Sequence, residues 1–387
     1  MCNCCLHQLR VADKLESLDG QGSNVTSASN EPEVAGILAG YQLPEKIPFG
    51  VELAPVMYRA EFRDGKWQAG SLVPFAEVPV NPASTALQFG QQAFEGMKAY
   101  QSDSGQPALF RPNMNWRRFA RSAQRLRMPV VPPALFADAL SRLACSLAEF
   151  VPGGRGQSLY LRPTIFGLDP HFAVKGSDRF LFLVIASPSD AYYAEPIRIM
   201  IERDNCRAAM GGTGAEKVGG NYAASLLANE NCNARGFDQS LWLDPTARKN
   251  IEELSAMNFM AVIDGALHTP ALSGSLLEGV TRDSLLTLAK HLGMEAVSRT
   301  MPIDELLTDI DSGRCSELFA CGTGAIVAPI ATIGEPDGRE WSVTDVGVVS
   351  AMLRDALLDI QEGKADDSFG WVIDSGDTKA LAEFIAG

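Results

Sequence analysis

The stretch GGTGAEKVGGNYAASL, residues 211–226, places one lysine between two glycine-rich turns. Two phosphate-binding loops resemble it, and the residues exclude both. A Walker A loop has glycine directly before its lysine and serine or threonine after it, where this chain has Glu216 and Val218. A dinucleotide-binding fingerprint requires a third glycine three residues beyond Gly214, and Lys217 occupies that position. Taken alone, the stretch also fits an ordinary surface lysine between tight turns.

The composition is that of a globular chain too long for one hydrophobic core. Of the 387 residues, 46% are hydrophobic and 21% are charged, which is typical of soluble proteins of two domains. No apolar run approaches the roughly 20 residues that cross a bilayer. The formal charge of -14 repels the phosphate backbone of nucleic acids. We therefore expect neither a membrane span nor a nucleic-acid partner.

The cysteines and the N-terminus predict a cytoplasmic protein without a metal. Eight cysteines are scattered along the chain with no regular framework, as in a reducing compartment. Cys2, Cys4 and Cys5 could bind a metal, but no partner set lies at a finger-like spacing, which favours a disordered tail. The first 35 residues lack the apolar core of a secretory signal. We expect residues 1–40 to form a disordered N-terminal extension.

Turn signals and apolar periodicity predict the first domain. A hairpin turns at Asp64-Gly65, and a second hairpin follows over residues 96–112. Asn115 is a candidate helix N-cap, because apolar residues follow it at helical spacing. Two strand-like runs, SLYLRPTIFG and RFLFLVIASP, complete a small α+β domain that we expect over residues 41–187.

A change in the order of elements predicts a second domain. Residues 188–196 are polar and proline-bounded, and we expect them to link the domains. Strands and helices alternate beyond them, which predicts a larger α/β domain around a mixed sheet over residues 197–387.

Seven blocks occur in one order along the chain. They are FGQQAFEGMKAY, LFRPNMNWRRFARSAQRLRMP, SLYLRPTIFG, GGTGAEKVGGNY, IEELSAMN, LLEGVTRDSLL and FACGTGAIVAP. In this order they resemble the branched-chain amino-acid aminotransferase family, among the fold-type IV enzymes that use pyridoxal 5'-phosphate (PLP). The resemblance covers residues 49–360, about four fifths of the chain. It implies a D-amino-acid aminotransferase-like fold, with a small α+β domain and a larger α/β domain.

The resemblance implies a role for three residues around the cofactor ring. Lys217 matches the Schiff-base lysine that also moves the proton between the substrate Cα and the cofactor, and a lysine amine can act as nucleophile and then as base. Tyr222 matches the tyrosine that hydrogen-bonds the phenolic oxygen. Glu253 matches the glutamate facing the pyridine nitrogen, where a carboxylate keeps that nitrogen protonated. Its neighbour Glu252 should point to the other face of the strand.

The cofactor phosphate needs neutralising groups. The resemblance implies an arginine, the N-terminus of a helix and a threonine hydroxyl. These are Arg118, Val280, Thr281 and Thr323. Arg117 and Arg121 are the alternatives to Arg118.

The substrate pocket of this family combines aromatic walls with an arginine. The residues that match it are Phe94, Tyr160, Arg162, Ala256 and Gly324. Three departures bear on the substrate: Phe89 stands where many relatives have tyrosine, and Ser255 and Ala256 replace glycine followed by glycine or threonine. Such small changes typically shift selectivity by about 1–3 kcal/mol. Members of the family are commonly dimers in which a small-domain loop completes the other subunit's pocket, so we expect a homodimer.

The expected reaction is ping-pong transfer of the amino group of leucine, isoleucine or valine to 2-oxoglutarate. Three alternatives stay open at this point. One is a specialised aminotransferase acting on a modified or aromatic amino acid, which Phe89 and Ala256 motivate. A second is a fold-type IV lyase acting on aminodeoxychorismate or a similar substrate, although the SLYLRP and FEGMKAY blocks favour an aminotransferase. The third is a non-catalytic protein of the same fold.

Overall fold

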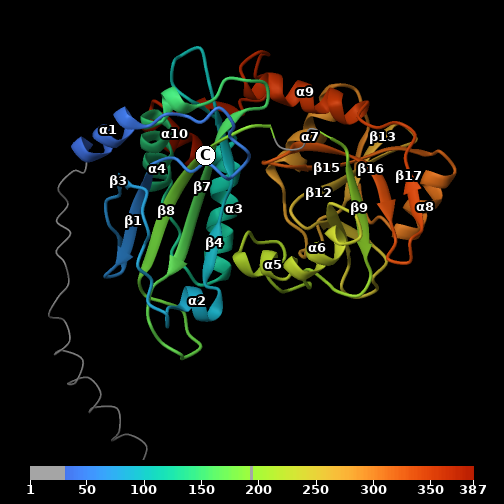
Figure 1. The fold of residues 1–387 in the computed structure, drawn as a ribbon, viewed down its shortest axis with the longest axis horizontal. Helices are drawn as coiled ribbons and strands as arrows, with labels where there is room; N and C mark the ends of the chain where they lie inside the picture. Colours follow the sequence, from blue (N-terminus) through green and yellow to red (C-terminus); the bar gives the residue numbers. More distant parts are fainter. Residues whose placement is uncertain (1–30, 192–194) are drawn as a thin grey trace, which may run out of the picture.

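The chain folds into two halves, each built around one large sheet (Figure 1). The structure is a computed structural model that describes residues 31–191 and 195–387. Most of the first half runs from blue to green in Figure 1 and the second from yellow to red, while the dark red helix at the C-terminal end lies with the first half. Both halves combine helices with strands, as the predicted α/β fold class requires. None of the helices in the described ranges is long and apolar enough to cross a membrane.

The first sheet has nine strands among the described residues, in the order β18-β6-β5-β7-β8-β1-β2, with β3 on β1 and β4 on β7. Every pairing within it is antiparallel. Its strands are β1 (Val56–Arg63), β2 (Lys66–Trp67), β3 (Ser71–Pro74), β4 (Gln92–Phe94), β5 (Met97–Tyr100), β6 (Ala108–Phe110), β7 (Ser158–Gly167), β8 (Phe180–Ser189) and β18 (Val372–Asp374). The helices of this half are α1 (Glu31–Gly40), α2 (Thr85–Phe89), α3 (Pro112–Arg125), α4 (Pro133–Ser146), the 3-10 turn η2 (Ala148–Phe150) and α10 (Thr378–Ala386).

The second sheet is mixed, and part of it closes on itself. Its order is β11-β10-β9-β16-β15-β12-β13-β14, with β17 on β16, and an additional β11–β12 pairing joins six of the strands into a ring. Its strands are β9 (Ile197–Glu202), β10 (Gln239–Leu243), β11 (Ile251–Leu254), β12 (Asn258–Ile263), β13 (Ala266–Pro270), β14 (Ala296–Arg299), β15 (Cys315–Gly322), β16 (Ile326–Gly334) and β17 (Glu340–Ser342). The helices are α5 (Gly219–Ala223), α6 (Leu226–Asn233), α7 (Val280–His291), α8 (Ile303–Asp311) and α9 (Val349–Gln361).

Local sequence explains the first hairpin and only part of helix α3. Asp64 and Gly65 both have positive φ, 54° and 73°, which is the backbone of a tight hairpin turn and confirms the predicted turn. Helix α3 begins at Pro112 rather than after Asn115, so the predicted N-cap is wrong. Proline suits the first turn of a helix because its missing N–H would have no partner there. The Asn115 amide instead donates to Glu95 Oε2 at 2.9 Å.

The two halves share a hydrophobic core. One core fills the space between the first sheet and helices α3, α4 and α10. A second is formed by side chains of the strands in the ring together with those of helix α8. A third packs helices α7 and α9 on the second sheet and includes Tyr100 and Phe110 from the first. The Tyr100 hydroxyl donates to Gln361 Oε1 across the junction at 3.0 Å. This shared packing places the cavity described below between two halves that contact each other directly.

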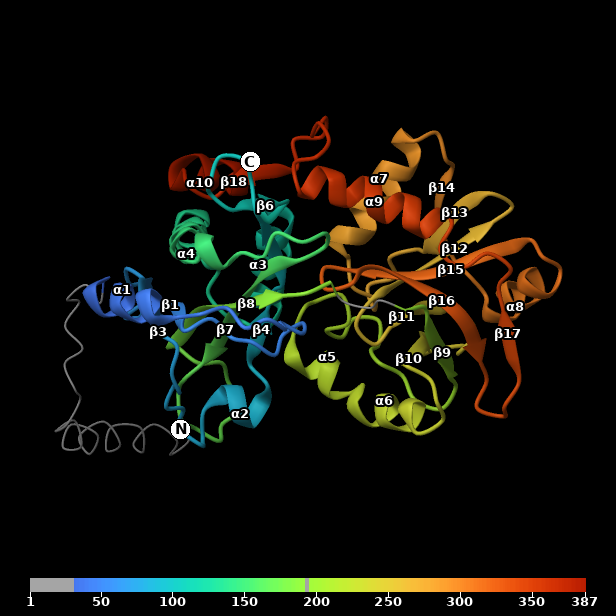
Figure 2. The ribbon, with the colours of Figure 1, turned by 45° about the horizontal axis from the view of Figure 1, so that its top comes forward.

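The end of the chain departs from the predicted division into domains. Strand β18 pairs with β6, and α10 lies beside α4 in the first half, as Figures 1 and 2 show. Leu381 and Ile385 are buried in the first core. Residues 372–386 therefore belong to the first half, although they follow the second half in the sequence. The other boundaries stay predictions.

The two segments expected to lack regular structure are only partly described. Residues 31–40 form α1 and are therefore helical rather than disordered. The rest of the predicted extension, with its cysteine cluster, lies outside the described residues. Strand β8 continues to Ser189, into the predicted linker, and residues 192–194 of that linker lie outside the described residues as well.

Candidate active site

A cavity lies between the two halves. All the site residues predicted from the sequence line it. They are Phe94, Arg118, Tyr160, Arg162, Lys217, Tyr222, Glu253, Ala256, Val280, Thr281, Thr323 and Gly324. They come from strands, helices and loops far apart in the sequence, so the fold brings them together.

Hydrogen bonds from the first half hold the backbone of Lys217. The Phe94 N–H donates to the Lys217 carbonyl at 3.0 Å, and the Lys217 N–H donates to Ser122 Oγ at 2.9 Å. Val218 forms an antiparallel bridge with Ala93 of β4. The Lys217 amine donates to the Tyr222 hydroxyl at 2.7 Å, and its Nζ lies 4.9 Å from the centre of the Phe94 ring. The lysine is therefore fixed at both its backbone and its amine.

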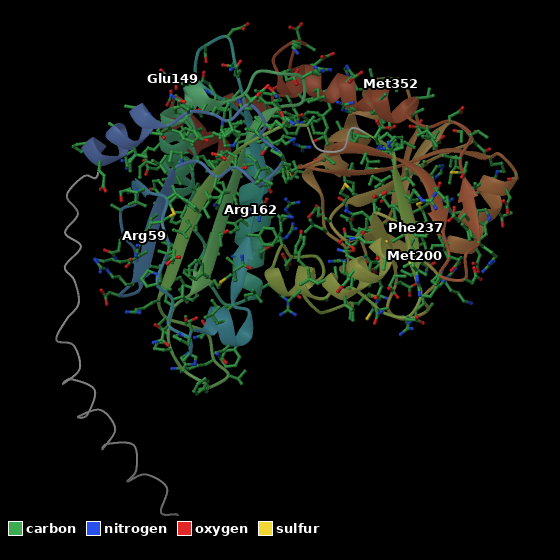
Figure 3. All side chains as sticks on the ribbon, viewed as in Figure 1. Arg59, Glu149, Arg162, Met200, Phe237 and Met352 are labelled. Carbon is green, nitrogen blue, oxygen red and sulfur yellow. The ribbon has the colours of Figure 1, made fainter. Side chains whose placement is uncertain are left out.

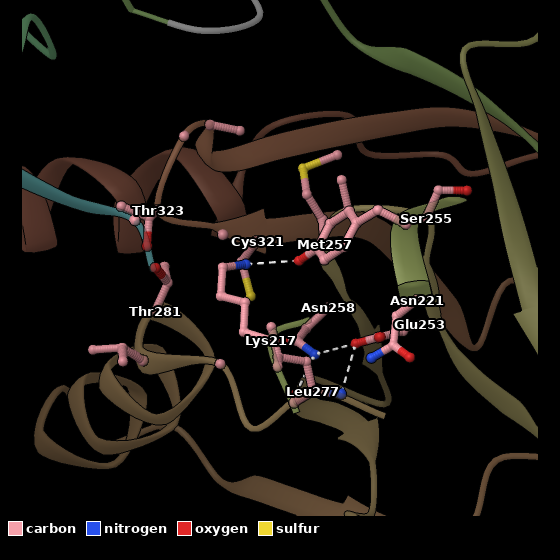
Figure 4. A pocket seen from close by; sticks show the side chains of 18 of the residues that line it. Lys217, Asn221, Glu253, Ser255, Met257, Asn258, Leu277, Thr281, Cys321 and Thr323 are labelled. Atoms are coloured by element: carbon pink, nitrogen blue, oxygen red, sulfur yellow. Dashed lines mark hydrogen bonds between the residues drawn. The ribbon is translucent and has the colours of Figure 1, made fainter. Parts of the chain in front are cut away.

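The Glu253 carboxylate lies where the ring of strands closes. Asn258 is its partner in the β11–β12 pairing. Glu253 Oε2 accepts from Asn258 Nδ2 at 3.0 Å and from the Leu277 N–H at 3.1 Å (Figure 4), and Glu253 Oε1 lies 2.8 Å from Arg207 Nη2. Burial raises the pKa of Glu253, and the positive charge of Arg207 is the largest influence in the opposite direction. The carboxylate is thus oriented by three donors in a buried place.

Arg118 of α3 forms a buried ion pair with Glu95. Its Nε and Nη2 donate to the two carboxylate oxygens at 2.6 and 2.8 Å, and its Nη1 donates to the Glu278 carbonyl at 3.0 Å. Burial favours the neutral form of Glu95, but the charge and hydrogen bonds of Arg118, together with Lys217 and Asn115, lower the pKa of this carboxyl below its usual range. The two alternative arginines do not line the cavity. Arg117 donates to the carbonyl of Gly387, and Arg121 pairs with the exposed Glu278 side chain.

The N-terminus of helix α7 opens to the cavity without a side-chain cap. Its N-cap residue is Gly279, and no described side chain accepts from the first N–H groups. Val280 and Thr281 begin the helix and line the cavity, as does Thr323 in the turn between β15 and β16. Figure 4 shows Thr281 and Thr323 on the opposite side of Lys217 from Glu253. Free N–H groups at a helix N-terminus bind anions such as phosphate.

Aromatic rings and one arginine form the wall on the first-sheet side. Arg162, labelled in Figure 3, donates from Nη2 to the Tyr160 hydroxyl at 3.0 Å, and its guanidinium lies 4.8 Å from the centre of the Phe94 ring. Its buried Nε has no hydrogen-bond partner among the described residues. Phe49 packs edge-on against Tyr160 with ring centres 4.9 Å apart. The wall therefore combines an apolar surface with a cation that can donate hydrogen bonds to a carboxylate.

The departures Ser255, Ala256 and Phe89 lie in two different places. Ser255 and Ala256 are the central residues of the turn between β11 and β12, closed by the Leu254 N–H and the Met257 carbonyl at 2.8 Å. The Ser255 hydroxyl accepts a hydrogen bond from Trp242 Nε1 and donates one to Asn229 Oδ1. Of the two residues, Ala256 is therefore the one whose side chain makes no hydrogen bond and can contact a ligand in the cavity. Phe89 does not line the cavity of its own chain. It lies 43% exposed at the end of α2.

Sequence reasoning missed four residues that shape this site. Glu95 and Asn258 lie inside the quoted blocks FEGMKAY and IEELSAMN, so their position beside Phe94 and Glu253 was a usable signal. Phe49 and Arg207 lie outside the blocks and gave no such signal. Across the described ranges, no group of His, Cys, Asp and Glu side chains is arranged to hold a metal ion.

Comparison with known proteins identifies relatives over most of the chain. Residues 92–333 match the model of the family described as amino-transferase class IV. The chain is 42% identical over 331 residues to a probable branched-chain-amino-acid aminotransferase of Streptomyces coelicolor, covering 84% of this chain and 91% of that one. It is 37% identical over 338 residues to branched-chain-amino-acid transaminase 1 of Bacillus subtilis, covering 86% and 95%.

Solved structures give the same result. The branched-chain amino acid aminotransferase of Escherichia coli superposes with a TM-score of 0.64 at 27% identity, covering 82% of this chain and 99% of that one. The branched-chain amino acid aminotransferase of Thermoproteus uzoniensis, solved with norvaline, superposes with a TM-score of 0.66 at 25% identity, covering 82% and 99%. A further branched-chain amino acid aminotransferase, complexed with N-(5'-phosphopyridoxyl)-L-glutamate, superposes with a TM-score of 0.67 at 29% identity, covering 83% and 99%.

The buried Glu95–Arg118 pair predicts a pH-dependent contribution to stability. Because the pKa of Glu95 is lower in the folded protein, its contribution is complete above the ordinary value of about 4.5 and is lost as the pH falls through the folded value. At pH 7, Glu95→Gln should lower the free energy of unfolding by about 3–5 kcal/mol. The difference from the wild type should shrink below pH 4.5. Urea unfolding of both proteins across this range measures it.

Glu61→Gln is the matched control, because Glu61 forms an exposed pair with Arg59 at 2.6 Å. It should cost less than about 1 kcal/mol. An equal loss in the two variants at pH 7, or a difference that does not change with pH, would contradict the prediction.

Proposed function

The chain belongs to the class IV aminotransferases, and to the branched-chain amino-acid aminotransferases among them, and from this premise we propose that it transfers the amino group of leucine, isoleucine or valine to 2-oxoglutarate. The observation that carries the proposal is the half-buried Lys217, whose amine is held between Tyr222 and Phe94 in a cavity that also contains Glu253 and the N-terminus of α7. Each chemical group of PLP has a counterpart in that set.

The residues fit PLP by their chemistry. The uncapped N-terminus of α7, with the hydroxyls of Thr281 and Thr323 and the Arg118 guanidinium, supplies donors for a phosphate. The Glu253 carboxylate supplies an acceptor for a protonated ring nitrogen, and the Lys217 amine is the nucleophile that would hold the aldehyde carbon. We propose Lys217, Arg118, Tyr222, Glu253, Val280, Thr281 and Thr323 as the cofactor site.

The division of work among these residues follows from their positions. When bound, PLP supplies an electron sink for the pair of electrons left on the substrate Cα after its proton is removed. With the cofactor bound, the Lys217 amine would be the base that takes this proton from the substrate Cα and later returns it. Tyr222, which accepts from the Lys217 amine at 2.7 Å, keeps the amine oriented. The Glu253 carboxylate would accept a hydrogen bond from the protonated ring nitrogen and so keep that nitrogen protonated.

The wall on the first-sheet side supports a pocket for two kinds of side chain. Phe49, Phe94 and Tyr160 offer apolar contact to a branched aliphatic group. Arg162, stacked between Phe94 and Tyr160, offers its guanidinium to the second carboxylate of glutamate or 2-oxoglutarate. We propose Ala256 and Gly324, which also line the cavity, as further substrate contacts.

A panel of amino donors tests the substrate. With 2-oxoglutarate as acceptor, kcat/KM for leucine, isoleucine and valine should exceed that for aromatic donors by roughly 10–200-fold, because the pocket discriminates by apolar contact. Steady-state kinetics with a coupled assay for glutamate measures it. Low turnover of all three aliphatic donors would favour a specialised aminotransferase. Release of pyruvate from an aminodeoxychorismate-type substrate without any amino acceptor would favour a lyase.

Covalent trapping tests Lys217. Borohydride reduction of the holoenzyme should leave a phosphopyridoxyl group on the Lys217 peptide, and Lys217→Ala should abolish both this adduct and the visible absorbance of the bound cofactor. Turnover should fall by at least about 10²–10⁴-fold, the range that acid–base catalysis alone provides. Peptide mass spectrometry locates the adduct. Lys249→Ala, which changes an exposed lysine, is the control. An adduct on another lysine would refute the assignment.

We also propose that the protein is a homodimer. A cluster of exposed apolar side chains, which we call the α2 patch, lies on α2 and the β7–β8 loop: Leu87 (63% exposed), Phe89 (43%), Phe172 (77%) and Val174 (93%). Monomeric proteins seldom expose contiguous groups of large apolar side chains. Phe89, which lies outside its own cavity, belongs to this patch, so a second copy covering the patch would place Phe89 close to the partner's surface.

Charges placed in the α2 patch should separate the subunits. We expect sedimentation velocity to show twice the mass of the chain for the wild type and a shift toward a single chain for Phe172→Asp/Val174→Asp, because a buried unpaired carboxylate is costly. Leu292→Asp, which changes an exposed leucine at the end of α7, is the control and should remain dimeric. A wild-type protein that sediments as one chain would refute the proposal.

A further inference from the structure

Arg207 is a buried cation beside the candidate site with no role in the function proposed above. It lies in the loop that connects β9 to α5 and lines the cavity. Its side chain is 5% exposed. Its Nη2 lies 2.8 Å from Glu253 Oε1 and donates to the carbonyl of Gly214 at 3.2 Å and to that of Ser275. One guanidinium nitrogen therefore contacts three separate segments of the chain.

The contacts of Glu253 leave one place on its carboxylate for another donor. An ionised carboxylate has about four acceptor sites, two on each oxygen. Asn258 Nδ2 and the Leu277 N–H occupy Oε2, and Arg207 occupies one site on Oε1. The site that remains is on Oε1, the oxygen that Arg207 holds. A protonated carboxyl would lose an acceptor site to its own O–H.

The charges that surround Glu253 decide whether it is ionised. Burial raises its pKa, and Arg207 opposes this most strongly, followed by Lys217, while Glu252 acts in the same sense as burial. Two more groups face Glu253 from α7 and β15: the buried Arg282, and Cys321, whose pKa is raised by burial to about 12 so that the thiol is neutral. Arg207 also offsets the charge of Glu252. One cation thus compensates two neighbouring carboxylates.

From this geometry we propose that Arg207 is a positioning residue that keeps Glu253 ionised and holds its Oε1 ready for the protonated ring nitrogen of PLP. The proposal rests on the PLP-dependent function given above. Arg207 acts through Glu253 and does not touch the substrate.

The two carbonyl contacts extend this role to the rest of the site. Gly214 lies three residues before Lys217, and a Cβ at Gly214 would collide with the Ser275 carbonyl. Ser275 belongs to the loop that provides the Leu277 N–H to Glu253 and then enters α7. Arg207 therefore joins the lysine loop, the strand that carries Glu253 and the segment before the anion-binding helix end. A lysine at this position would keep the charge but could not reproduce the planar guanidinium's contacts.

The first test measures the protonation of Glu253 in the apoprotein at neutral pH, where no cofactor or activity is involved. Infrared spectroscopy should show a protonated carboxyl band in Arg207→Met that is absent from Arg207→Met/Glu253→Gln. The wild type and Arg207→Lys should lack the band. Arg125→Met is the matched control, because Arg125 also donates to carbonyls of the glycine-rich loop, those of Gly211 and Gly212, but is exposed and contacts no carboxylate of the described residues. A Glu253 that stays ionised in Arg207→Met would overturn the proposal.

The second test measures PLP affinity in a double-mutant cycle. Arg207→Met should raise the dissociation constant of PLP by about tenfold or more in the wild-type background, the ratio that one pKa unit represents. It should have a much smaller effect in the Glu253→Gln background, and Arg207→Lys should restore part of the affinity. An equal loss in both backgrounds would show a merely structural role and refute the proposal.

Two further controls keep the outcomes separate. Failure of the wild type to bind PLP would refute the proposed function and leave the infrared result on Glu253 to stand by itself. Circular dichroism establishes that each variant is folded. If Arg207→Met is not, Arg207→Gln against Arg207→Lys makes the same comparison, since glutamine removes the charge and keeps hydrogen-bonding capacity.

Discussion

The geometry of the candidate site depends on a short pairing between two parts of the chain that belong to different halves. Val218 bridges Ala93 of β4, and the Phe94 N–H donates to the Lys217 carbonyl. With the bond from the Lys217 N–H to Ser122, both sides of this residue are tied to the first half. The chain then enters α5 in the second half, where the Tyr222 hydroxyl accepts a hydrogen bond from the Lys217 amine. The lysine is therefore held at the junction by backbone contacts that do not depend on its own side chain.

Charged groups buried at this junction are paired, and the pairing serves the site. A buried charge without a partner is strongly unfavourable, and removing one partner leaves the other uncompensated. Arg118 pairs with Glu95, and Arg207 pairs with Glu253. Glu95 orients the Arg118 guanidinium, and Arg207 orients the Glu253 carboxylate. In each pair, the group that faces the cavity therefore has one orientation. Pairing thus provides order in a region where helices, strands and loops meet.

The free N–H groups at the start of α7 contrast with these satisfied groups. Gly279 has no side chain that could cap the helix, and Val280 and Thr281 face the cavity. Donors of this kind are satisfied by caps, water or ligands. Packing holds the start of α7 in place, because the core shared by the two halves packs α7 and α9 against the second sheet. Residues 372–374 also pair with the first sheet. An anion binding there would meet donors that are already in place.

Much of the local structure follows from the sequence by itself. The alternating run SLYLRPTIFG is strand β7, and the hairpin turn forms at Asp64-Gly65 because these residue types tolerate the positive φ that the turn requires. Lys217 and Glu253 were identified as site residues because short-range blocks around them match a known family, and both line the cavity.

Only the tertiary structure decided which groups these residues meet. The sequence predicted Asn115 as a helix N-cap. Its amide instead donates a hydrogen bond to Glu95, because α3 packs against the segment that follows β4. Arg207 carried no signal in the sequence, yet it holds Glu253. Phe89 lies on the surface of its own chain rather than in the cavity. Local spacing and backbone preference determine where helices, strands and turns form, whereas the partner of a buried charge depends on which distant segments pack together, and no local pattern records that.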